Sequence, residues 1–476
     1  MLMGVPDLSP DWLEALVALA YALTALAVTV HVLLTKRDVR AALGWIALAW
    51  LTPAIGALIY YGFGINRVSR RATRIGAFQG VPAPTAPAPP ALSPEIAGLA
   101  AIVGRVTGRA LAPGNAVALF CGGDEAYPAM LAAICEARHS IALASYIFRG
   151  DKTGRAFIDA LAAAQSRGVA VRVLIDSVGS GYIYSSALRR LRAKAIPAAR
   201  FLHTWLPWRM PFLNLRSHKK LLIVDGAIGF TGGLNIGAEY SARLARSDYT
   251  DDVHIRVQGP ITRQLMESFA QDWTFTTGET LDQEIWWPPP AEAGSVVARG
   301  VRSGPDTDIG KLEAVLGAAL AQARKRVRIV TPYFLPDRRL EFAIAQATLR
   351  GVALEILIPE HCDSTFIDWA MRAHIAFLPE PPATVRLSPA PFDHAKLMTV
   401  DGQWCLVGSS NWDTRSLRLN FEFDVECYDA ALTGQIDALI DRKIAESRPL
   451  GPEDLAARPV PIRLRDAAAR LFLPYL

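Results

Sequence analysis

The feature that most constrains this chain is a short motif that occurs twice with the same internal spacing. Each copy reads His-x-Lys-x4-Asp, and the six residues are His218, Lys220, Asp225, His394, Lys396 and Asp401. One His-x-Lys pair alone is more often structural than catalytic. Two copies with identical spacing predict a duplicated unit in which each half supplies part of one catalytic site.

The repeat is wider than the motif. Each copy continues through an apolar segment to small residues and an Asn, which are Gly232, Gly233 and Asn235 in the first copy and Gly408, Ser409 and Asn411 in the second. Upstream, residues 141–148 and 167–176 correspond to residues 327–334 and 350–359. Helical and strand-like runs alternate in both halves, which is typical of α/β domains. We predict two similar domains over residues 95–280 and 300–446, related by a pseudo-two-fold axis.

The motif suits a strand followed by a hairpin. In a strand over residues 218–224, His218 and Lys220 share one face because side chains alternate. Asp225 and Gly226 form a turn signal, so the returning arm brings the small residues and Asn235 back toward His218. We expect these small residues to leave backbone amides and the Asn side chain available to anionic oxygens.

Two facing units place a His and a Lys from each half in one cleft. The two lysines and the two asparagines suit a phosphoryl group whose negative charge grows in the transition state. One His can attack phosphorus and form a phosphohistidine, while the other acts as general acid and then general base. The Asp of each motif is expected to orient an imidazole. This chemistry needs no metal or cofactor. His254 and His361 lack such a context and are open to a supporting or a structural role.

The N-terminal part has the character of a membrane segment. Residues 15–35 and 41–66 carry no charge, and each run is long enough to cross a bilayer as a helix. We predict a transmembrane hairpin within residues 1–75, with helices at about 12–35 and 41–65; a helical hairpin buried in a soluble core is the alternative. Basic residues follow both runs, so the positive-inside rule leaves the orientation open. A Pro/Ala-rich linker over 76–94 and a tail over 447–476 complete the expected organisation.

Composition agrees with this interpretation but is less specific. Hydrophobic residues make up 51% of the chain, and the net charge of +5 suits an anionic lipid surface or a phosphorylated substrate. The five cysteines have no C-x-x-C spacing, so neither a disulfide framework nor a zinc site is expected.

The paired motifs resemble those of the phospholipase D superfamily, and within it the chain is similar to the bacterial cardiolipin synthases. The closer similarity lies in residues 44–64, 331–334, 411–422 and 470–476. It implies that the chain transfers a phosphatidyl group from one phosphatidylglycerol to a second, giving cardiolipin and glycerol. It also implies mixed sheets flanked by helices, a role for Ser409 and Glu422 in substrate binding, and a multi-pass protein of the bacterial inner membrane with cytoplasmic catalytic domains. Ala144 and Asp251 depart from the family pattern, so the lipid pair is open.

The paired motifs also fit other functions. A phospholipase D or a phosphatidyltransferase would use water or a different alcohol at the same site. A membrane-anchored nuclease would need a broad basic groove, and no Lys/Arg-dense stretch lies near either motif, so no nucleic-acid partner is expected. A catalytically dead scaffold conflicts with two intact motifs. The Trp-rich residues 202–212 suit either a lipid wedge or a packing loop. The nucleophilic His, with a weak preference for His218 by analogy, and the oligomeric state are open.

Overall fold

The computed structural model describes residues 10–36, 39–64, 92–204, 215–245, 248–378 and 383–472. The chain divides into a small N-terminal unit and a large unit that contains both motifs. The predicted linker lies outside the described residues except for its last three positions, and most of the Trp-rich segment 202–212 also lies outside them.

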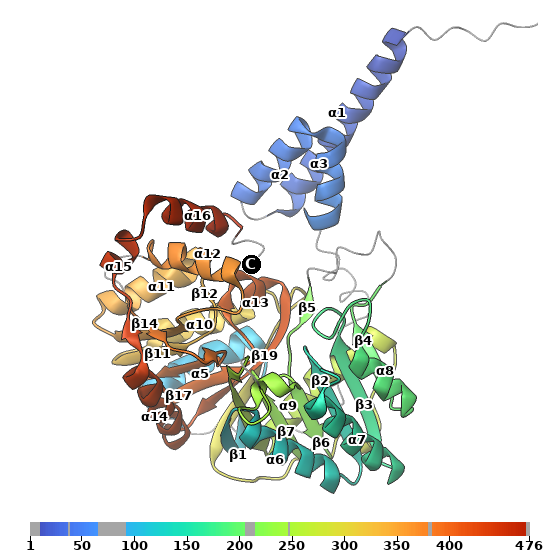
Figure 1. The fold of residues 1–476 in the computed structure, drawn as a ribbon, viewed down its shortest axis with the longest axis vertical. Coiled ribbons are helices and arrows are strands. Elements are labelled where there is room, and N and C mark those ends of the chain that lie inside the picture. The colour runs from blue at the N-terminus through green and yellow to red at the C-terminus, as the bar shows by residue number, and fades with distance from the viewer. Residues whose placement is uncertain are drawn as a thin grey trace, which may run out of the picture. The chain divides into compact units, whose positions relative to one another are not determined.

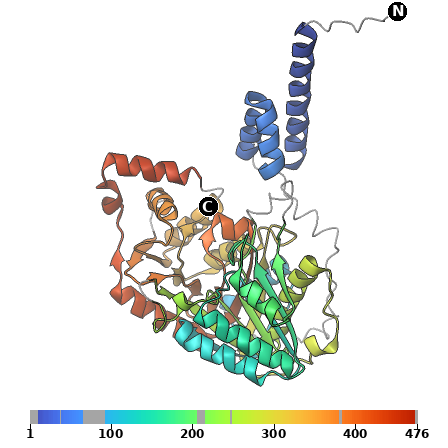
Figure 2. The ribbon, with the colours of Figure 1, turned by 45° about the vertical axis from the view of Figure 1, so that its right-hand side comes forward.

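The N-terminal unit begins with one long apolar helix, α1 (Pro10–Thr35). Residues 12–35 of this helix are long and apolar enough to cross a membrane, as judged by length and composition. Figure 2 shows α1 running beyond the shorter helices of the same unit. The prediction of a first apolar helix at about 12–35 is confirmed.

The second predicted helix is not continuous, so that expectation is wrong. The segment forms α2 (Val39–Leu51), α3 (Pro53–Ile59) and a π-helical turn, η1 (Tyr60–Gly64). Thr52 has φ −136°, outside the helical region, because the residue before a proline is pushed from helical geometry. A Cβ at Gly56 would lie 2.3 Å from the Leu48 carbonyl oxygen, so glycine lets α3 fold back against the end of α2.

The large unit is built on one 16-stranded mixed sheet in which the same strand order occurs twice (Figure 1), and two short two-stranded sheets accompany it. The order is β1-β9-β7-β6-β2-β3-β4 in the first half and β10-β19-β17-β16-β11-β13-β14-β20 in the second. The first-half strands are β1 (Ala112–Cys121), β2 (Ser140–Ser145), β3 (Ala170–Asp176), β4 (Ala198–Phe201), β6 (Leu221–Val224), β7 (Ile228–Gly232) and β9 (Val253–Gln258). The second-half strands are β10 (Val296–Ser303), β11 (Arg326–Val330), β13 (Ala353–Pro359), β14 (Thr384–Ser388), β16 (Leu397–Val400), β17 (Trp404–Gly408), β19 (Asn420–Tyr428) and β20 (Arg448–Pro449).

The two halves join through antiparallel β1 and β10, so a pseudo-two-fold axis passes between these strands. In each half, three strands are parallel, β2-β3-β4 and β11-β13-β14, and the strands nearer the axis are antiparallel. All residues of β2 are buried, which explains why it appears in the sequence as a continuous small and apolar run. The predicted α/β fold with two similar halves is confirmed. The domain boundaries stay a prediction, because the halves share one sheet.

Helices cover both faces of the sheet (Figure 1). The first part of the chain supplies α5 (Pro94–Thr107), α6 (Gly123–Glu136), α7 (Lys152–Ser166), α8 (Ser186–Ala193) and α9 (Ile261–Thr277), of which α5 packs into the core of the second half. In the second half they are α10 (Lys311–Gln322), α11 (Arg338–Leu349), α12 (Thr365–Ile375), α13 (Thr414–Arg418), α14 (Ala430–Glu446), α15 (Pro452–Ala456) and α16 (Val460–Arg470). The predicted C-terminal tail therefore contains two helices and the edge strand β20.

Candidate active site

Each motif His is anchored to the opposite half of the sheet. The segment before His218 forms β5 (Arg216–Ser217), which pairs with the start of β19, and the segment before His394 forms β15 (Phe392–Asp393), which pairs with β8 (Thr250–Asp251). The His218 N–H donates to the Phe421 carbonyl at 2.9 Å, and the His394 N–H donates to the Asp251 carbonyl at 2.7 Å. The two halves thus cross over at the site, which brings both motifs into one place.

The side chain of His218 is fixed by two acceptors from the second half. Its Nδ1 lies 2.9 Å from the Ser409 carbonyl oxygen and 3.0 Å from Glu422 Oε2. Because both partners can only accept, we assign the proton to Nδ1, which leaves a lone pair on Nε2. Glu422 is itself held by Ser409 Oγ at 2.6 Å and by Asn420 Nδ2 at 3.1 Å.

His394 has the symmetry-related arrangement with one difference. Its Nδ1 lies 2.7 Å from Asp252 Oδ2, and Lys396 Nζ approaches the same Nδ1 at 2.7 Å. The imidazole nitrogen therefore lies between an acceptor and a donor, whereas His218 Nδ1 meets acceptors alone. Burial lowers the pKa of His394 well below its usual value, and the charges of Lys396 and Lys220 lower it further.

The lysines place two cations beside the imidazoles. Burial lowers the pKa of Lys220 to about 7, although the Glu422 carboxylate opposes the shift. Burial also lowers the pKa of Lys396, against the effect of Asp252 and Glu422. Lys220 Nζ donates to the His218 carbonyl at 2.6 Å and lies 5.4 Å from the centre of the Tyr146 ring. A buried ammonium group is unfavourable unless an anion lies beside it. The two lysines therefore suit the binding of a negatively charged phosphoryl group.

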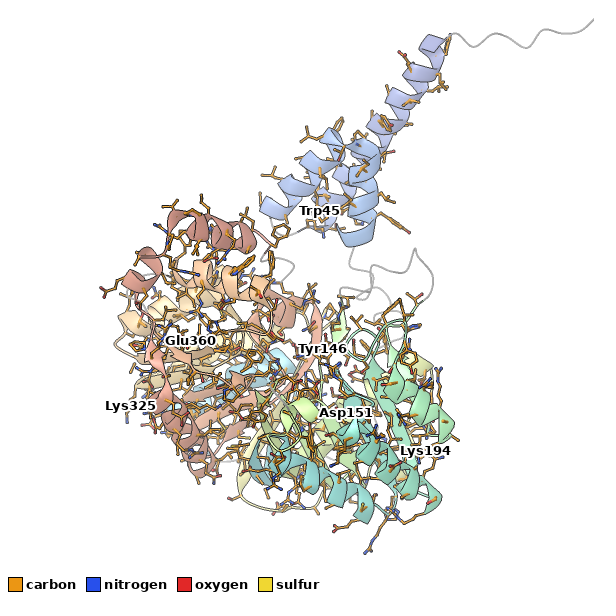
Figure 3. All side chains as sticks on the ribbon, viewed as in Figure 1. Trp45, Tyr146, Asp151, Lys194, Lys325 and Glu360 are labelled. Atoms are coloured by element: carbon orange, nitrogen blue, oxygen red, sulfur yellow. The ribbon has the colours of Figure 1, made fainter. Side chains whose placement is uncertain are left out.

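An aromatic ring accompanies each histidine. The Tyr146 ring lies edge-on to His218 with centroids 5.0 Å apart, and the Tyr333 ring lies 6.1 Å from His394. Figure 3 shows Tyr146 near the middle of the large unit in this view, whereas Lys194 lies at its edge. Both tyrosines follow the parallel strand that lies nearest the axis in their half, β2 or β11, so the repeat in the sequence is also a repeat in the site.

The Asp of each motif does not orient an imidazole, contrary to expectation. The Asp225 carboxylate accepts hydrogen bonds from the backbone N–H groups of Arg138, His139 and Ser140, at 2.9, 2.7 and 2.9 Å. Asp401 repeats this with three backbone N–H groups at 2.8 Å, those of Arg324, Lys325 and Arg326. Both Asp residues lie in the predicted hairpin turns, with φ values of 50° and 53°. They hold the hairpin to the start of β2 or β11, and Glu422 and Asp252 orient the histidines instead.

The small residues after the hairpin have a packing role, so the expectation of free amides is also wrong. The Gly233 N–H donates to the Val253 carbonyl at 2.9 Å, and the Ser409 N–H donates to the Phe423 carbonyl at 3.2 Å. A Cβ at Gly233 would lie 2.0 Å from Asp252 Oδ1. A Cβ at Gly232 would lie 2.8 Å from the His254 Cα. Glycine is therefore needed there because the carboxylate that orients His394 packs directly against the backbone.

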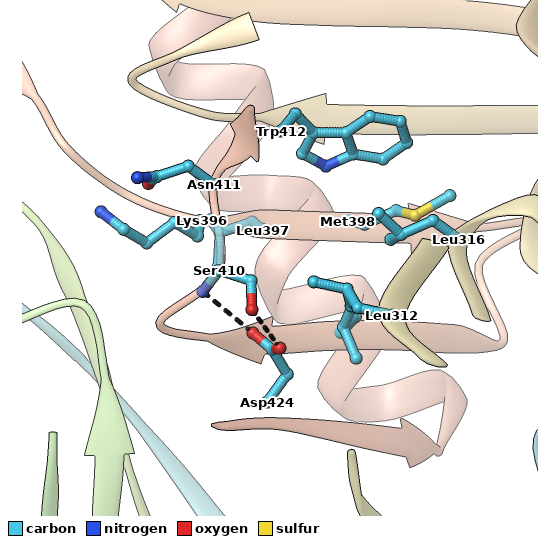
Figure 4. Close-up of a pocket in the computed structure, with 10 residues that line it drawn as sticks. Leu312, Leu316, Lys396, Leu397, Met398, Ser410, Asn411, Trp412 and Asp424 are labelled. Carbon is cyan, nitrogen blue, oxygen red and sulfur yellow. Dashed lines mark hydrogen bonds between the residues drawn. The ribbon is translucent and has the colours of Figure 1, made fainter. Parts of the chain in front are cut away.

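The two asparagines differ in their contacts. Asn235 Oδ1 accepts from the Ile147 N–H at 3.0 Å and its Nδ2 donates to the Tyr240 hydroxyl at 2.7 Å, so this side chain positions the chain after β2. Asn411 Oδ1 is buried without a hydrogen-bond partner among the described residues. Figure 4 shows Asn411 beside Lys396 at a small cavity. At the same cavity, Ser410 donates two hydrogen bonds to the Asp424 carboxylate, one from its N–H at 3.2 Å and one from its Oγ. Of the two asparagines, only Asn411 keeps an unpaired side-chain acceptor among the described residues.

Sequence reasoning missed Asp252, and a pairing in the sheet explains how it could be found. Gly232 pairs with His254 across β7 and β9, and Gly408 pairs with Asp424 across β17 and β19. Asp252 and Glu422 each lie two residues before these partners, so they are equivalent positions in the repeat. Aligning the halves through β9 and β19 would have identified Asp252.

His254 and His361, whose roles the sequence left undecided, do not belong to the group of reacting side chains. Burial lowers the pKa of His254 to about 3, so it stays neutral behind the glycines. His361 is exposed in the turn before α12. Among the residues that the structure describes, no group of three or more His, Cys, Asp or Glu side chains could hold a metal ion.

Comparison with known proteins agrees with this geometry. Residues 130–273 and 316–444 match the family model described as "Cardiolipin synthase, PLD-like domain". The chain is 32% identical to the major cardiolipin synthase of Bacillus subtilis over 76% of each chain. It is 29% identical to a cardiolipin synthase of Geobacillus kaustophilus over 93% of this chain and 90% of that one. Among solved structures, a phosphatidylserine synthase of Haemophilus influenzae matches with a TM-score of 0.57 at 16% identity, covering 76% of this chain and 95% of that chain.

The doubled sheet and the crossed pair of histidines define an enzyme of the phospholipase D class. Within that class, the chain belongs to the cardiolipin synthase family.

Proposed function

We propose that this enzyme transfers a phosphatidyl group from one phosphatidylglycerol to a hydroxyl of a second, giving cardiolipin and glycerol. The observation that carries the proposal is the crossed arrangement of the site. Each imidazole is held through Nδ1 by a carboxylate from the other half, and both lysines lie buried beside them. Family membership makes phosphatidyl transfer the expected class of reaction.

The first step is nucleophilic attack on phosphorus. His218 is the better nucleophile, because the two acceptors at Nδ1 leave the Nε2 lone pair free. A P–N bond forms and the bond from phosphorus to the glycerol oxygen breaks. This step needs His394 as the imidazolium, although burial and the two lysine charges lower its pKa in the free enzyme. The anionic phosphodiester of the bound lipid offsets the lysine charges, and the Asp252 carboxylate at Nδ1 stabilises the protonated ring. The imidazolium then donates its proton to the leaving alkoxide. The products are free glycerol and a phosphatidyl-histidine.

The second step reverses the roles at the same centre. His394, now neutral, accepts the proton of the incoming hydroxyl of the second phosphatidylglycerol. The hydroxyl oxygen attacks phosphorus, the P–N bond breaks, and cardiolipin leaves with His218 restored. Lys220 and Lys396 stabilise the charge on the non-bridging phosphoryl oxygens in both steps, with the ammonium groups already positioned by burial.

The membrane placement forms part of the proposal. α1 provides an apolar helix of sufficient length, and the substrates are bilayer lipids. We expect an inner-membrane protein with its catalytic unit on the cytoplasmic side. Water or another alcohol as acceptor would give a phospholipase D or a different phosphatidyltransferase through the same intermediate.

The test is lipid turnover by the purified full chain in mixed micelles that contain phosphatidylglycerol, with EDTA present. We expect equal amounts of cardiolipin and glycerol, identified by mass spectrometry. His218→Ala and His394→Ala should each abolish product, and the matched control His361→Ala, an exposed histidine, should retain normal turnover. Labelled phosphatidylglycerol should leave a covalent phosphatidyl group on His394→Ala and none on His218→Ala.

The alternative outcomes are distinct. Phosphatidic acid in place of cardiolipin would identify water as the acceptor. Cleavage of single-stranded DNA with no lipid product would support a nuclease. Near-normal turnover in either alanine variant would contradict the two-histidine scheme.

A further inference from the structure

The C-terminal helix α16 lies at the periphery of the large unit (Figures 1 and 2), packed against α12. The described residues leave one apolar face of this helix uncovered. Val460, Leu464 and Leu471 are 63%, 66% and 79% exposed. Together with Ala467 they follow spacings of four, three and four residues, which places them on one helical face. A helix of a soluble domain normally turns such a stripe toward the core. Here Asp466 and Ala469 face inward instead.

Basic side chains flank this apolar stripe. Residues 458–472 contain four arginines and a single acidic residue, Asp466. Asp466 binds Arg458 at 2.6 Å and Arg465 at 2.8 Å, so these two arginines are already neutralised in part. Arg463 is exposed beside the stripe, and the Arg470 guanidinium lies 4.3 Å from the centre of the Phe377 ring. The uncovered face thus combines an apolar centre with uncompensated positive charge.

An open groove of about 390 Å³ continues the apolar stripe onto the neighbouring helices. Its apolar lining comes from α16, the end of α12 and α15, and includes Leu464, Ala373 and Leu455. Phe377, at its rim, is 62% exposed. Apolar groups at this density on one face of a soluble protein indicate an interaction surface.

The same surface extends toward the active site through α12. Phe472, just after α16, contacts Phe366 in the first turn of α12 with ring centroids 5.6 Å apart. α12 begins two residues after Asp363, whose carboxylate accepts from the Tyr333 hydroxyl at 2.7 Å. Tyr333 is the ring beside His394. A contact made by α16 and Phe366 is therefore connected to the surroundings of His394 through Asp363 and Tyr333.

We propose that α16, with Phe366 and Phe377 of the α12 region, docks the catalytic unit onto the surface of an anionic phospholipid bilayer. An apolar stripe flanked by arginines is the composition that lies in the interface of such a bilayer, with the side chains of the stripe below the headgroups. Charge complementarity favours this occupant over an apolar protein partner, which would leave Arg463 without an anion. The surface is separate from the reacting groups, so docking and chemistry can be tested independently.

The test uses the full chain in lipid nanodiscs, with a photo-crosslinking residue, p-benzoylphenylalanine, in place of Leu464. Leu349 is the matched control position, because it is 63% exposed at the end of α11. In discs of phosphatidylglycerol and phosphatidylcholine, position 464 should crosslink to lipid several-fold more than position 349. Arg463→Glu should lower the lipid crosslinking at 464 by roughly fivefold or more, because one basic residue near an anionic surface is replaced by an acidic one. Discs of phosphatidylcholine alone should reduce it similarly.

Other outcomes would overturn the docking proposal. Crosslinks from position 464 to residues 10–64 would show that the N-terminal unit covers this face. Crosslinks to a second copy of the chain would make it a subunit interface. Lipid crosslinking equal to that at position 349 would show an exposed helix without a membrane role. None of these results bears on whether the histidines form cardiolipin, which the micelle assay decides.

Discussion

The hairpin turn of the first motif offers a direct test of how this fold is held together. Replacing Asp225 by Ala removes three hydrogen bonds from backbone N–H groups at 2.7–2.9 Å. At about 1 kcal/mol for each partly exposed bond, the loss is about 3 kcal/mol. A further cost of about 1 kcal/mol arises because alanine disfavours the left-handed conformation, φ 50°, that Asp225 adopts. We expect Asp225→Ala to lower the free energy of unfolding by about 4 kcal/mol.

Asp225→Asn separates the hydrogen bonds from the backbone conformation. Asparagine tolerates positive φ, and its Oδ1 can still accept from the N–H groups of His139 and Ser140. Only the bond from the Arg138 N–H to Oδ2 is lost, so the expected destabilisation is about 1–2 kcal/mol. Asp401→Asn should behave alike, because its three partners repeat those of Asp225.

The assay is urea or thermal unfolding of the full chain in detergent, followed by tryptophan fluorescence, with transfer activity measured well below both midpoints. Activity per folded molecule should stay within about threefold of the native enzyme for Asp225→Asn, since no interaction specific to the transition state is removed. The structural role argued for this carboxylate would be refuted if Asp225→Asn left the unfolding midpoint unchanged and yet made the enzyme as inactive as His218→Ala.

Three further predictions concern the site and its pH dependence. Glu422→Gln should lower kcat by roughly 10²–10⁴-fold with little change in KM, because the group that fixes the His218 tautomer loses its charge; steady-state kinetics in mixed micelles checks this. Lys220 has a pKa of about 7, so kcat/KM should fall as pH rises through about 7, and Lys220→Arg, which keeps its charge, should move that limb to higher pH if it folds. Burial, with the charge of Arg470, lowers the pKa of His374 to about 4. Its unfolded pKa is about 6.5, so the unfolded chain binds the proton first and stability falls as pH drops from about 6.5 to about 4. His374→Gln should lessen that loss in thermal unfolding at pH 7 and 4.5.

The sequence predicted the repeat, the hairpin and the grouping of four motif residues, because each depends on local pattern. His218 and Lys220 belong to one short segment, and the Asp225–Gly226 turn is encoded in two adjacent residues. The turn appears as expected, and both of its residues have positive φ. Even the broken second apolar helix had a visible cause, since Pro53 removes a helical hydrogen bond and restricts Thr52.

Partners of the motif residues could not be predicted in the same way, because they come from distant strands. Asp225 reaches the start of β2 through the register of β6 against β2, which no local spacing encodes. Asp252 lies against Gly233 through the pairing of β7 with β9. The sequence shows that residue 233 is a glycine. That the Asp252 carboxylate packs against it is known only once β7 and β9 are paired.

The exchange of carboxylates between the two halves has a consequence for how the enzyme could diversify. A dimer of identical halves would have to present the same residue beside both histidines, so any change would alter both sides together. In one covalent chain each side changes alone, and this chain has Asp252 with Gly233 on one side and Glu422 with Ser409 on the other. Fusion therefore permits one histidine to specialise in holding the phosphoryl group while its counterpart specialises in admitting the alcohol.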